Sequence, residues 1–317
     1  MAKKVTHRNY PLATSRIAAI ISIAFLFVLS PGQNYYQTLT LNPQPKLVRA
    51  TNFDDFTPAK YPVKTSKETP PEITASAAGI LDLDSGVYIY QKNLRQKLRP
   101  ASLTKLVTAL VAIDYYPLEQ ILTATPLVNT KGESQMGLKL GDQLSVENLL
   151  YGLLIPSGND AAYVLASNYP GGTENFVAKM NLKAKSLSMF DTFFDNPIGT
   201  DSAMMQTSVW DMGLLAREIL KNGLLKKITG TNWAVVPDAN NLKKYPLQNV
   251  NQLLLNFPGT FGIKTGTTEQ AGQCLISATR RQGQTIIAIT LNSTDRFNET
   301  IKLSNWALNN TTPAVLH

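Results

Sequence analysis

The sequence predicts an α+β fold in which an antiparallel five-stranded sheet is flanked by helices, with an inserted all-helical region. Two strand-like segments stand early in the folded part, within residues 77–93, and three more stand late, within residues 261–292. Helical patterns fill the middle of the chain, and one more follows the last strand. Strands from both ends can then pair in one sheet, and the helices cover its faces.

The first 72 residues differ in character from the rest of the chain. The basic start, MAKKVTHRNYPLATSR, precedes thirteen apolar residues, Ile17–Leu29, whereas a membrane span needs about 20. We expect residues 1–32 to be a secretory signal peptide or, as residues 17–36, an uncleaved membrane anchor. Either segment would place the folded domain outside the cytoplasm, on the cell-wall side of the membrane. Prolines and scattered charges predict an extended linker at 33–72, followed by the folded domain at 73–317.

The positive charge of the chain is concentrated before the folded domain. Nine of the 30 Lys and Arg residues precede residue 69, against only three of the 22 acidic residues. Most of the formal net charge of +8 therefore belongs to the N-terminal segment. No stretch of basic residues interleaved with aromatic ones follows it, so nucleic acid is excluded as the expected partner.

The scarcity of cysteine and histidine restricts the chemistry of the domain. Cys274 is the one cysteine, so an internal disulfide is excluded. His7 and His317 are the two histidines and stand outside the core segments, so a Ser-His-Asp triad, a Cys-His dyad and a histidine-ligated metal site are excluded. We expect no metal and no cofactor. A hydrolase built on this chain would need a lysine or a carboxylate as its base.

Each element of the predicted fold has a local signal. Two apolar segments around Asp84-Ser85-Gly86 indicate an early hairpin. Four helical patterns follow, at residues 102–116, 145–154, 159–169 and 207–222, of which the first is apolar nearly all round and should be buried. Strands are expected at 261–268, 271–281 and 284–292, and a closing helix at 296–310.

The first helical segment carries Ser102 and Lys105 one turn apart, and therefore on one face. The helix macrodipole and burial both disfavour a charged lysine in the first turn of an apolar helix, and so favour its neutral amine. A neutral amine beside a serine hydroxyl is a general base beside a nucleophile. The alternative is that Ser102 only caps the helix and that the Lys105 side chain extends to solvent.

A second polar motif, Ser157-Gly158-Asn159, occupies a short loop between two predicted helices. A serine and an asparagine two positions apart on a tight loop can point the same way, so that one relays a proton and the other holds a substrate amide. The alternative is a helix cap formed by Asn159 or Asp160.

A third motif, Lys264-Thr265-Gly266-Thr267, lies on a predicted strand. A glycine inside a strand often marks the close approach of a ligand or of another backbone segment. The lysine supplies a cation, and the two threonines supply hydroxyl groups that could hold a carboxylate. The alternative is a solvated edge strand with alternating polar residues.

Together, the three motifs resemble those of the penicillin-recognising serine acyltransferases. Ser-x-x-Lys, Ser-x-Asn and Lys-Thr-Gly each occur once, in this order. Within that group the chain is similar to the serine-type D-alanyl-D-alanine carboxypeptidases, the low-molecular-mass penicillin-binding proteins, from Ile73 to Leu308. MGLKLGD, NVNQLL and AGQCL support the resemblance. It implies a β-lactamase/transpeptidase-like fold, with residues 73–317 as the catalytic, penicillin-binding domain.

The resemblance also implies a mechanism. Lys105 would take the proton of Ser102, which would attack the carbonyl between the two D-alanines of a peptidoglycan stem peptide. Ser157, with Lys264 behind it, would pass a proton to the departing amine, and Asn159 would hold the peptide amide and the amine of the base. Water would then release the acyl-enzyme, and β-lactams would acylate the same serine as covalent inhibitors.

The remaining implied contacts concern the substrate. The backbone N–H groups of Ser102 and Thr267 would form the oxyanion hole. Thr265, Gly266, Thr267 and Arg296 would bind the substrate, with the two hydroxyl groups and the guanidinium at its terminal carboxylate. Thr267 departs from the pattern, because some family members have histidine there, and Gln273 stands where an aromatic residue is common. We expect no C-terminal β-domain or C-terminal anchor, so that any membrane attachment would come from Ile17–Leu29.

Three other functions fit parts of this pattern. A D,D-transpeptidase or D,D-endopeptidase would use the same motifs, which do not distinguish water from an amine as acceptor. A class A β-lactamase needs a deacylating glutamate after its Ser-x-Asn loop, and Glu174 and Glu218 are the only glutamates between Ser157 and Lys264. A β-lactam sensor would need a membrane-spanning signalling partner domain, which we do not expect here.

Overall fold

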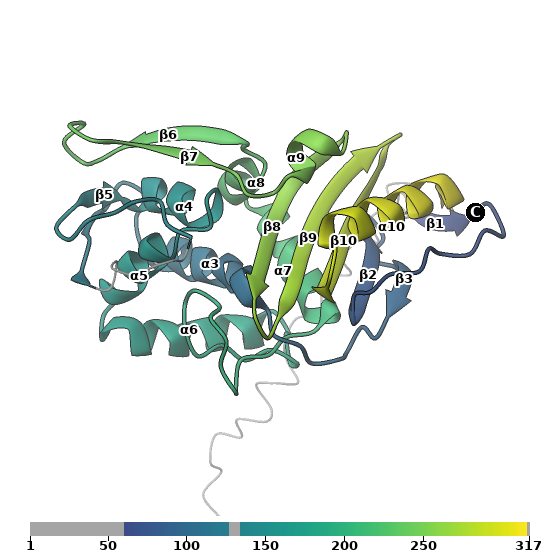
Figure 1. The fold of residues 1–317 in the computed structure, drawn as a ribbon, viewed down its shortest axis with the longest axis horizontal. Coiled ribbons are helices and arrows are strands. Elements are labelled where there is room, and N and C mark those ends of the chain that lie inside the picture. Colours follow the sequence, from purple (N-terminus) through teal and green to yellow (C-terminus); the bar gives the residue numbers. More distant parts are fainter. Residues whose placement is uncertain (1–59, 127–133, 316–317) are drawn as a thin grey trace, which may run out of the picture. The chain divides into compact units, whose positions relative to one another are not determined.

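A five-stranded antiparallel sheet forms the frame of the fold (Figure 1). The structure is a computed structural model that describes residues 60–126 and 134–315. The strand order is β3-β2-β10-β9-β8. The strands are β2 (Ala77–Asp82), β3 (Tyr88–Lys92), β8 (Thr260–Thr268), β9 (Gly272–Arg281) and β10 (Gln284–Ser293). Early and late strands thus share one sheet, which confirms the predicted α+β architecture.

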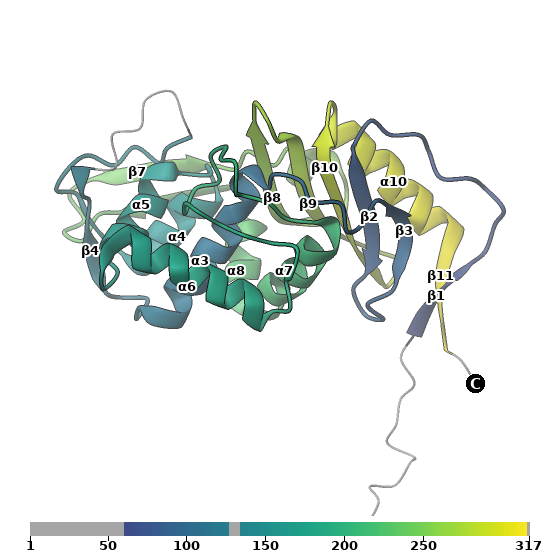
Figure 2. The ribbon, with the colours of Figure 1, turned by 90° about the horizontal axis from the view of Figure 1, so that it is seen from below.

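Helices lie on both faces of this sheet and beside its β8 edge (Figures 1 and 2). The 3-10 helix η2 (Ala101–Thr104) leads into α3 (Lys105–Tyr115). The other helices are α4 (Val146–Leu154), α5 (Asn159–Ser167), α6 (Gly172–Ser186), α7 (Val209–Lys221), α8 (Gly223–Thr229), α9 (Leu253–Asn256) and α10 (Arg296–Asn310). Three two-stranded ribbons complete the described part: β1 (Lys60–Lys64) with β11 (Thr311–Val315), β4 (Ile121–Thr123) with β5 (Gln143–Ser145), and β6 (Trp233–Pro237) with β7 (Lys244–Gln248).

Strand β10 lies in the middle of the sheet and is apolar on both faces, because helices cover both. Ile286 and Ala288 pack with Leu303 and Trp306 of α10. The alternate residues, such as Ile287, point to the opposite face, where they join the main core together with residues of α7. Water is therefore excluded from both faces of the sheet. The polar Lys-Thr-Gly motif lies on β8, which is an edge strand.

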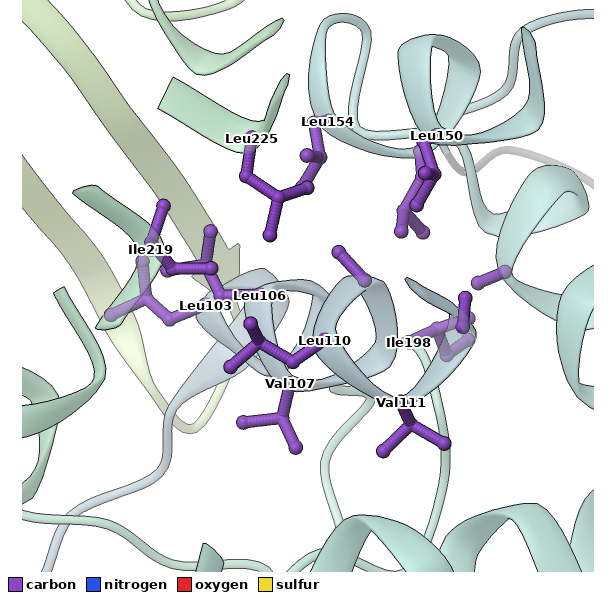
Figure 3. Close-up of a cluster of buried hydrophobic side chains, with 14 of the residues drawn as sticks. Leu103, Leu106, Val107, Leu110, Val111, Leu150, Leu154, Ile198, Ile219 and Leu225 are labelled. Carbon is purple, nitrogen blue, oxygen red and sulfur yellow. The ribbon is translucent and has the colours of Figure 1, made fainter. Parts of the chain in front are cut away.

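Helix α3 lies at the centre of the main core, as its sequence predicts. Figure 3 shows Leu106, Val107, Leu110 and Val111 directed to different sides of the helix. The neighbours drawn around them belong to α4, α7, α8 and the segment after α6: Leu150, Leu154, Ile219, Leu225 and Ile198. With apolar partners on every side, α3 is held rigidly, and so is the turn η2 that precedes it.

The structure extends the folded part to before residue 73. Strand β1 falls within the segment expected to be a linker at 33–72, and pairs along its whole length with β11. Further along, Trp306 Nε1 donates to the carbonyl of Glu68 at 3.2 Å, and Asn310 Nδ2 donates to its carboxylate at 3.0 Å. Residues 60–72 are therefore attached to α10 and β11. Residues 1–59, with the expected signal or anchor, lie outside the described residues.

Several elements of the middle region go beyond the sequence prediction. Helix α6, the short helix α9 and the β6–β7 hairpin were not expected. Gly223 lies just beyond the predicted helix at 207–222 and also opens α8, because Asn222 Oδ1 accepts from the N–H of Leu225 at 3.0 Å and caps the new helix. None of the helices in the described ranges is both long enough and apolar enough to cross a membrane.

Candidate active site

Ser102 and Lys105 lie within hydrogen-bond distance of each other at the start of α3. Lys105 Nζ donates to Ser102 Oγ at 2.8 Å, and the lysine side chain is fully buried. Ser102 belongs to the 3-10 turn, and neither η2 nor α3 has a side-chain cap. The serine is therefore not a helix cap and the lysine does not reach solvent, so both structural alternatives from the sequence are excluded.

The Ser-x-Asn loop approaches the same amine from the other side. Ser157 lies between α4 and α5, with its hydroxyl 3.5 Å from Lys105 Nζ. Its φ of +64° is unusual for a residue with a side chain, and together with burial it fixes the direction of this hydroxyl. Asn159 opens α5, is largely buried, and lines a cavity together with Ser102.

Strand β8 contributes a second buried lysine. Lys264 is 1% exposed and donates to the carbonyl of Thr265 at 3.1 Å. Burial first, and then the positive charges of Lys105 and Arg296, lower the pKa of Lys264 well below its ordinary value. Among the described residues, Lys264 has no carboxylate within ion-pair distance. The arrangement therefore favours the neutral amine of Lys264, which can exchange protons rather than only hold an anion.

Gly266 allows β8 to lie directly against the backbone of the serine turn. A Cβ at this position would be 2.9 Å from Ser102 N, 2.9 Å from the Ala101 Cβ and 3.2 Å from the Pro100 carbonyl. Every other residue type carries a Cβ, so only glycine permits this separation. The sequence predicted that Gly266 marks the close approach of a ligand or of another backbone segment. The structure shows that it is a backbone segment, the turn that carries Ser102.

Arg296 joins the same strand from the first turn of α10. Its Nη1 donates to the Gly266 carbonyl at 2.8 Å and also to Thr267 Oγ1. The guanidinium lies over the ring of Phe297, 4.8 Å from the ring centre, and burial lowers its pKa. The family resemblance alone implied that Arg296 binds substrate. In the structure this residue lies beside Thr267.

These groups surround a cavity of about 230 Å³. It is lined by Ser102, Ser134, Asn159, Ile198, Gly199, Thr200, Thr267 and Thr268. Lys105, Ser157 and Lys264 are buried beneath its surface, and Thr265 is buried without lining it. A larger cavity of about 720 Å³, at the beginning of β8 around Phe261, contains none of the candidate residues.

Asp160 is a functional candidate to which sequence reasoning gave only a capping role. It is fully buried, and its carboxylate accepts from the N–H groups of Met136, Gly137, Leu138 and Ala161 at 2.9 to 3.0 Å. The neighbouring Asn159 N–H donates to the Ser134 carbonyl at 2.8 Å. Asp160 therefore fixes the 134–138 segment against the start of α5, where Asn159 lies.

Comparisons with known proteins agree with this geometry. The family model described as D-alanyl-D-alanine carboxypeptidase matches residues 64–295. The D-alanyl-D-alanine carboxypeptidase DacF of Bacillus subtilis is 34% identical over 241 residues, which are 74% of this chain and 61% of the relative. The D-alanyl-D-alanine carboxypeptidase DacC of Escherichia coli is 33% identical over 79% of this chain and 65% of the relative. The chain thus spans somewhat less than two thirds of the length of both relatives.

Solved structures are similar as well. The crystal structure of the Streptomyces K15 DD-transpeptidase superposes with a TM-score of 0.72 at 29% identity, covering 76% of this chain and all of that one. The D-alanyl-D-alanine carboxypeptidase DacD of Francisella tularensis gives a TM-score of 0.70 at 28% identity, with 77% and 72% of the two chains covered. The fold, the family match over most of the described residues and the three motifs around one cavity agree: the chain belongs to the D-alanyl-D-alanine carboxypeptidase family.

Proposed function

We propose that this protein is a serine-type D-alanyl-D-alanine carboxypeptidase that removes the terminal D-alanine from peptidoglycan stem peptides. The observation that carries the proposal is the 2.8 Å distance between Ser102 Oγ, which lines the cavity, and Nζ of the fully buried Lys105. Such a distance permits proton transfer from hydroxyl to amine, and the described residues offer no histidine that could act instead.

The reaction would begin with the neutral amine of Lys105. It takes the proton of the Ser102 hydroxyl as Oγ bonds to the carbonyl carbon between the two D-alanines. Backbone N–H groups of Ser102 and Thr267 stabilise the oxyanion that forms, because Gly266 holds the two segments together. The positive charge that Lys105 then carries lowers the pKa of the buried Lys264 and favours the neutral amine of Lys264 at this step.

Collapse of the tetrahedral intermediate breaks the peptide bond and needs a proton for the leaving amine. The Ser157 hydroxyl, 3.5 Å from Lys105 Nζ, would relay it, with Lys264 as a further proton carrier. Asn159 would hold the amide of the acyl part, and Thr265, Thr267 and Arg296 would act on the side of the terminal carboxylate. Water, deprotonated in turn by Lys105, would release the shortened peptide and restore Ser102.

Transfer of the acyl group from Ser102 to an amine, instead of to water, is the second candidate function. It is favoured by the likeness to the Streptomyces K15 DD-transpeptidase and by a relative named D-alanyl-D-alanine endopeptidase in Pseudomonas aeruginosa, 29% identical over 78% of this chain. β-Lactamase activity is disfavoured, because Glu174 on α6 and Glu218 on α7 do not line the cavity. In the cell we expect an exported enzyme on the cell-wall side of the membrane, with residues 1–32 as signal or anchor and β-lactams as covalent inhibitors.

Mass spectrometry of the products formed from purified muropeptides tests the proposal. We expect release of free D-alanine from pentapeptide stems by the full chain, and no release by the S102A variant. Fluorescent penicillin should label the protein but not S102A, and slow loss of the label distinguishes a penicillin-binding protein from a β-lactamase. Cross-linked or cleaved dimers as the main products would refute the carboxypeptidase assignment, and labelling of S102A would refute the site.

A further inference from the structure

Two walls of the active-site cavity are joined by a single carboxylate. One wall is the segment of Gly199 and Thr200, and the other is the end of β8 with Thr268. Asp201 lies between them: Thr268 Oγ1 donates to its Oδ1 at 2.6 Å, and the N–H of Gln270 donates to its Oδ2 at 2.9 Å. Both oxygens of the carboxylate are thus engaged by the strand and the turn that follows it.

The segment that carries Asp201 is itself rigid. Asn196 Oδ1 accepts from the N–H groups of Ile198, Gly199 and Thr200, at 3.2, 2.7 and 3.2 Å. Gly199 has a φ of +89°, and a Cβ there would be 1.9 Å from the Ala101 carbonyl. The segment therefore presses against the residue that precedes Ser102. Asp201 attaches this fixed segment to β8 and so closes a frame around the nucleophile.

The position of this contact indicates which part of a substrate would be affected. Arg296 and Thr267 mark the side on which the terminal carboxylate would lie. The acyl part, which precedes the scissile bond, must then leave Ser102 on the other side, between Asn159 and the two walls. Thr200 and Thr268 both line the cavity there, and Asp201, which follows Thr200, connects the two segments.

We propose that Asp201 is a positioning residue that fixes the acyl-side wall of the active site. The inference rests on the proposed function, because it assigns one side of the cavity to the acyl part of the peptide. Asp201 acts through Thr200 and Thr268 and takes no part in proton transfer. Its loss would loosen the binding of the longer acyl part and leave the chemistry at Ser102 largely intact.

The D201A variant of the full chain tests this with two substrates of different length. For a stem pentapeptide we expect KM to rise about tenfold, the equivalent of about 1.4 kcal/mol of lost binding, with kcat changed less than about threefold. For N-acetyl-D-alanyl-D-alanine, whose acyl part is much shorter, we expect a smaller rise in KM. D201N, which keeps one acceptor, should give an intermediate value.

Two further variants make the test specific. T268V removes the hydroxyl on the other wall, and the double variant D201A/T268V should then show no larger rise in KM than D201A alone. D238A is the matched control, because Asp238 also uses its carboxylate on backbone N–H groups, those of Leu242 and Lys243 at 2.7 and 3.1 Å, in the distant β6–β7 turn. It should leave both kinetic constants unchanged.

Some results would overturn the assignment. One is an unchanged KM with a lower kcat for D201A, because this pattern indicates loss of folded protein. The others are an equal rise in KM for both substrates, and additive effects of D201A and T268V on KM. Absence of D-alanine release by the wild-type protein refutes the proposed function instead. In that case the same series is measured as rates of penicillin acylation, and a D201A rate equal to that of the wild type overturns the positioning role.

Discussion

Gly266 lies against the backbone nitrogen of Ser102, so that a side chain at position 266 would meet it at 2.9 Å. This contact brings β8 and η2 together, and with them two of the three polar motifs. A strand edge and a helix start rarely approach so closely, because side chains separate them. The proposed oxyanion hole of Ser102 and Thr267 therefore depends on the absence of a Cβ at position 266.

G266A is therefore expected to disturb the active site more than the fold. The added methyl group faces backbone atoms that cannot move aside, so β8 and η2 must separate, at a cost of about 1–3 kcal/mol. A shift of about 1 Å at the reacting groups costs on the order of 100-fold in rate. We expect this loss in the rate of penicillin acylation, measured by stopped-flow or gel labelling.

G79A is the matched control for this prediction. Gly79 lies in β2 of the same sheet, and a Cβ there would be 2.8 Å from Tyr88 Cε1 and 3.0 Å from Leu94 Cδ2. A methyl group at position 79 would be as crowded as one at position 266, but its neighbours are side chains that lie away from Ser102. G79A should lower the free energy of unfolding and retain the acylation rate of its folded fraction. Equal acylation rates for G266A and the wild type would contradict the role given to the contact.

Arg296 is expected to recognise the terminal carboxylate of the substrate. In R296A, the preference for a peptide acid over the corresponding C-terminal amide should fall about 30-fold, since hydrogen bonds to charged groups contribute about 1.5–3 kcal/mol. The measurement is kcat/KM for the two peptides with each protein. A preference that survives in R296A would assign the carboxylate to other groups.

Arg281 offers a control of the same chemistry. Its guanidinium also lies over an aromatic ring, 4.1 Å from the centre of Phe257, and donates to the Pro258 carbonyl at 2.9 Å. It lines no part of the active-site cavity. R281A should therefore leave the preference for the acid unchanged, and a similar loss in both variants would indicate a general effect of removing an arginine.

Sequence reasoning found the elements whose signals are local. The helix around Lys105, the late strands and the early hairpin around Asp84-Ser85-Gly86 all follow from periodicity and turn residues within ten or so positions. The three motifs were visible for the same reason, since each spans at most four residues. Their assembly around one cavity followed from the resemblance rather than from any local pattern.

The missed features depend on contacts between distant positions. Strand β1 pairs with β11 across almost the whole domain, and Asp201 meets Thr268 67 positions later. The β6–β7 hairpin was hidden because Pro237 and Pro246 are unusual in strands and are tolerated here in a two-stranded ribbon. A capping role for Asp160 could be predicted from the sequence, but its hydrogen bonds to the N–H groups of Met136, Gly137 and Leu138, 22 to 24 positions away, could not.

D160N is expected to affect stability and activity together. The amide keeps the size of the side chain but presents an NH₂ group to N–H donors, so part of the set of four hydrogen bonds is lost in a fully buried site. We expect about 3 kcal/mol less free energy of unfolding, measured with urea. The 134–138 segment and Asn159 should also shift, which slows penicillin acylation of the folded protein.

The buried carboxylate of Asp211 separates the two effects. It accepts from the N–H of Asp191 at 2.8 Å and from Thr192 Oγ1 at 2.7 Å, on α7 and away from the cavity. D211A, which removes the oxygen that accepts both hydrogen bonds, should destabilise the protein without changing the acylation rate of molecules that remain folded. If D160N acylates as fast as the wild type, Asp160 serves stability alone.

Glu299 attaches the beginning of the sheet to α10. Its carboxylate accepts from the backbone N–H of Thr74, from that of Ala75 at 3.2 Å, and from Ser293 Oγ at 2.5 Å. Burial acts to raise the pKa of Glu299, but these hydrogen bonds together outweigh it, and the pKa is lowered from 4.5. The folded protein therefore holds the charged form of Glu299 more strongly than the unfolded chain does.

The E299Q variant should consequently lose stability in a pH-dependent way. A carboxyl group with a lowered pKa contributes its stabilisation fully above the unfolded value of 4.5, and loses it as the pH falls through the folded value. At pH 7 we expect E299Q to unfold with about 2 kcal/mol less free energy than the wild type, and the difference should shrink as the pH approaches 3. Urea denaturation at several pH values measures this, with the exposed Glu119 substituted in E119Q as the control, which should stay within about 0.5 kcal/mol of the wild type throughout. A difference for E299Q that is the same at pH 7 and pH 3 would show that shape rather than charge attaches residues 74–75 to α10.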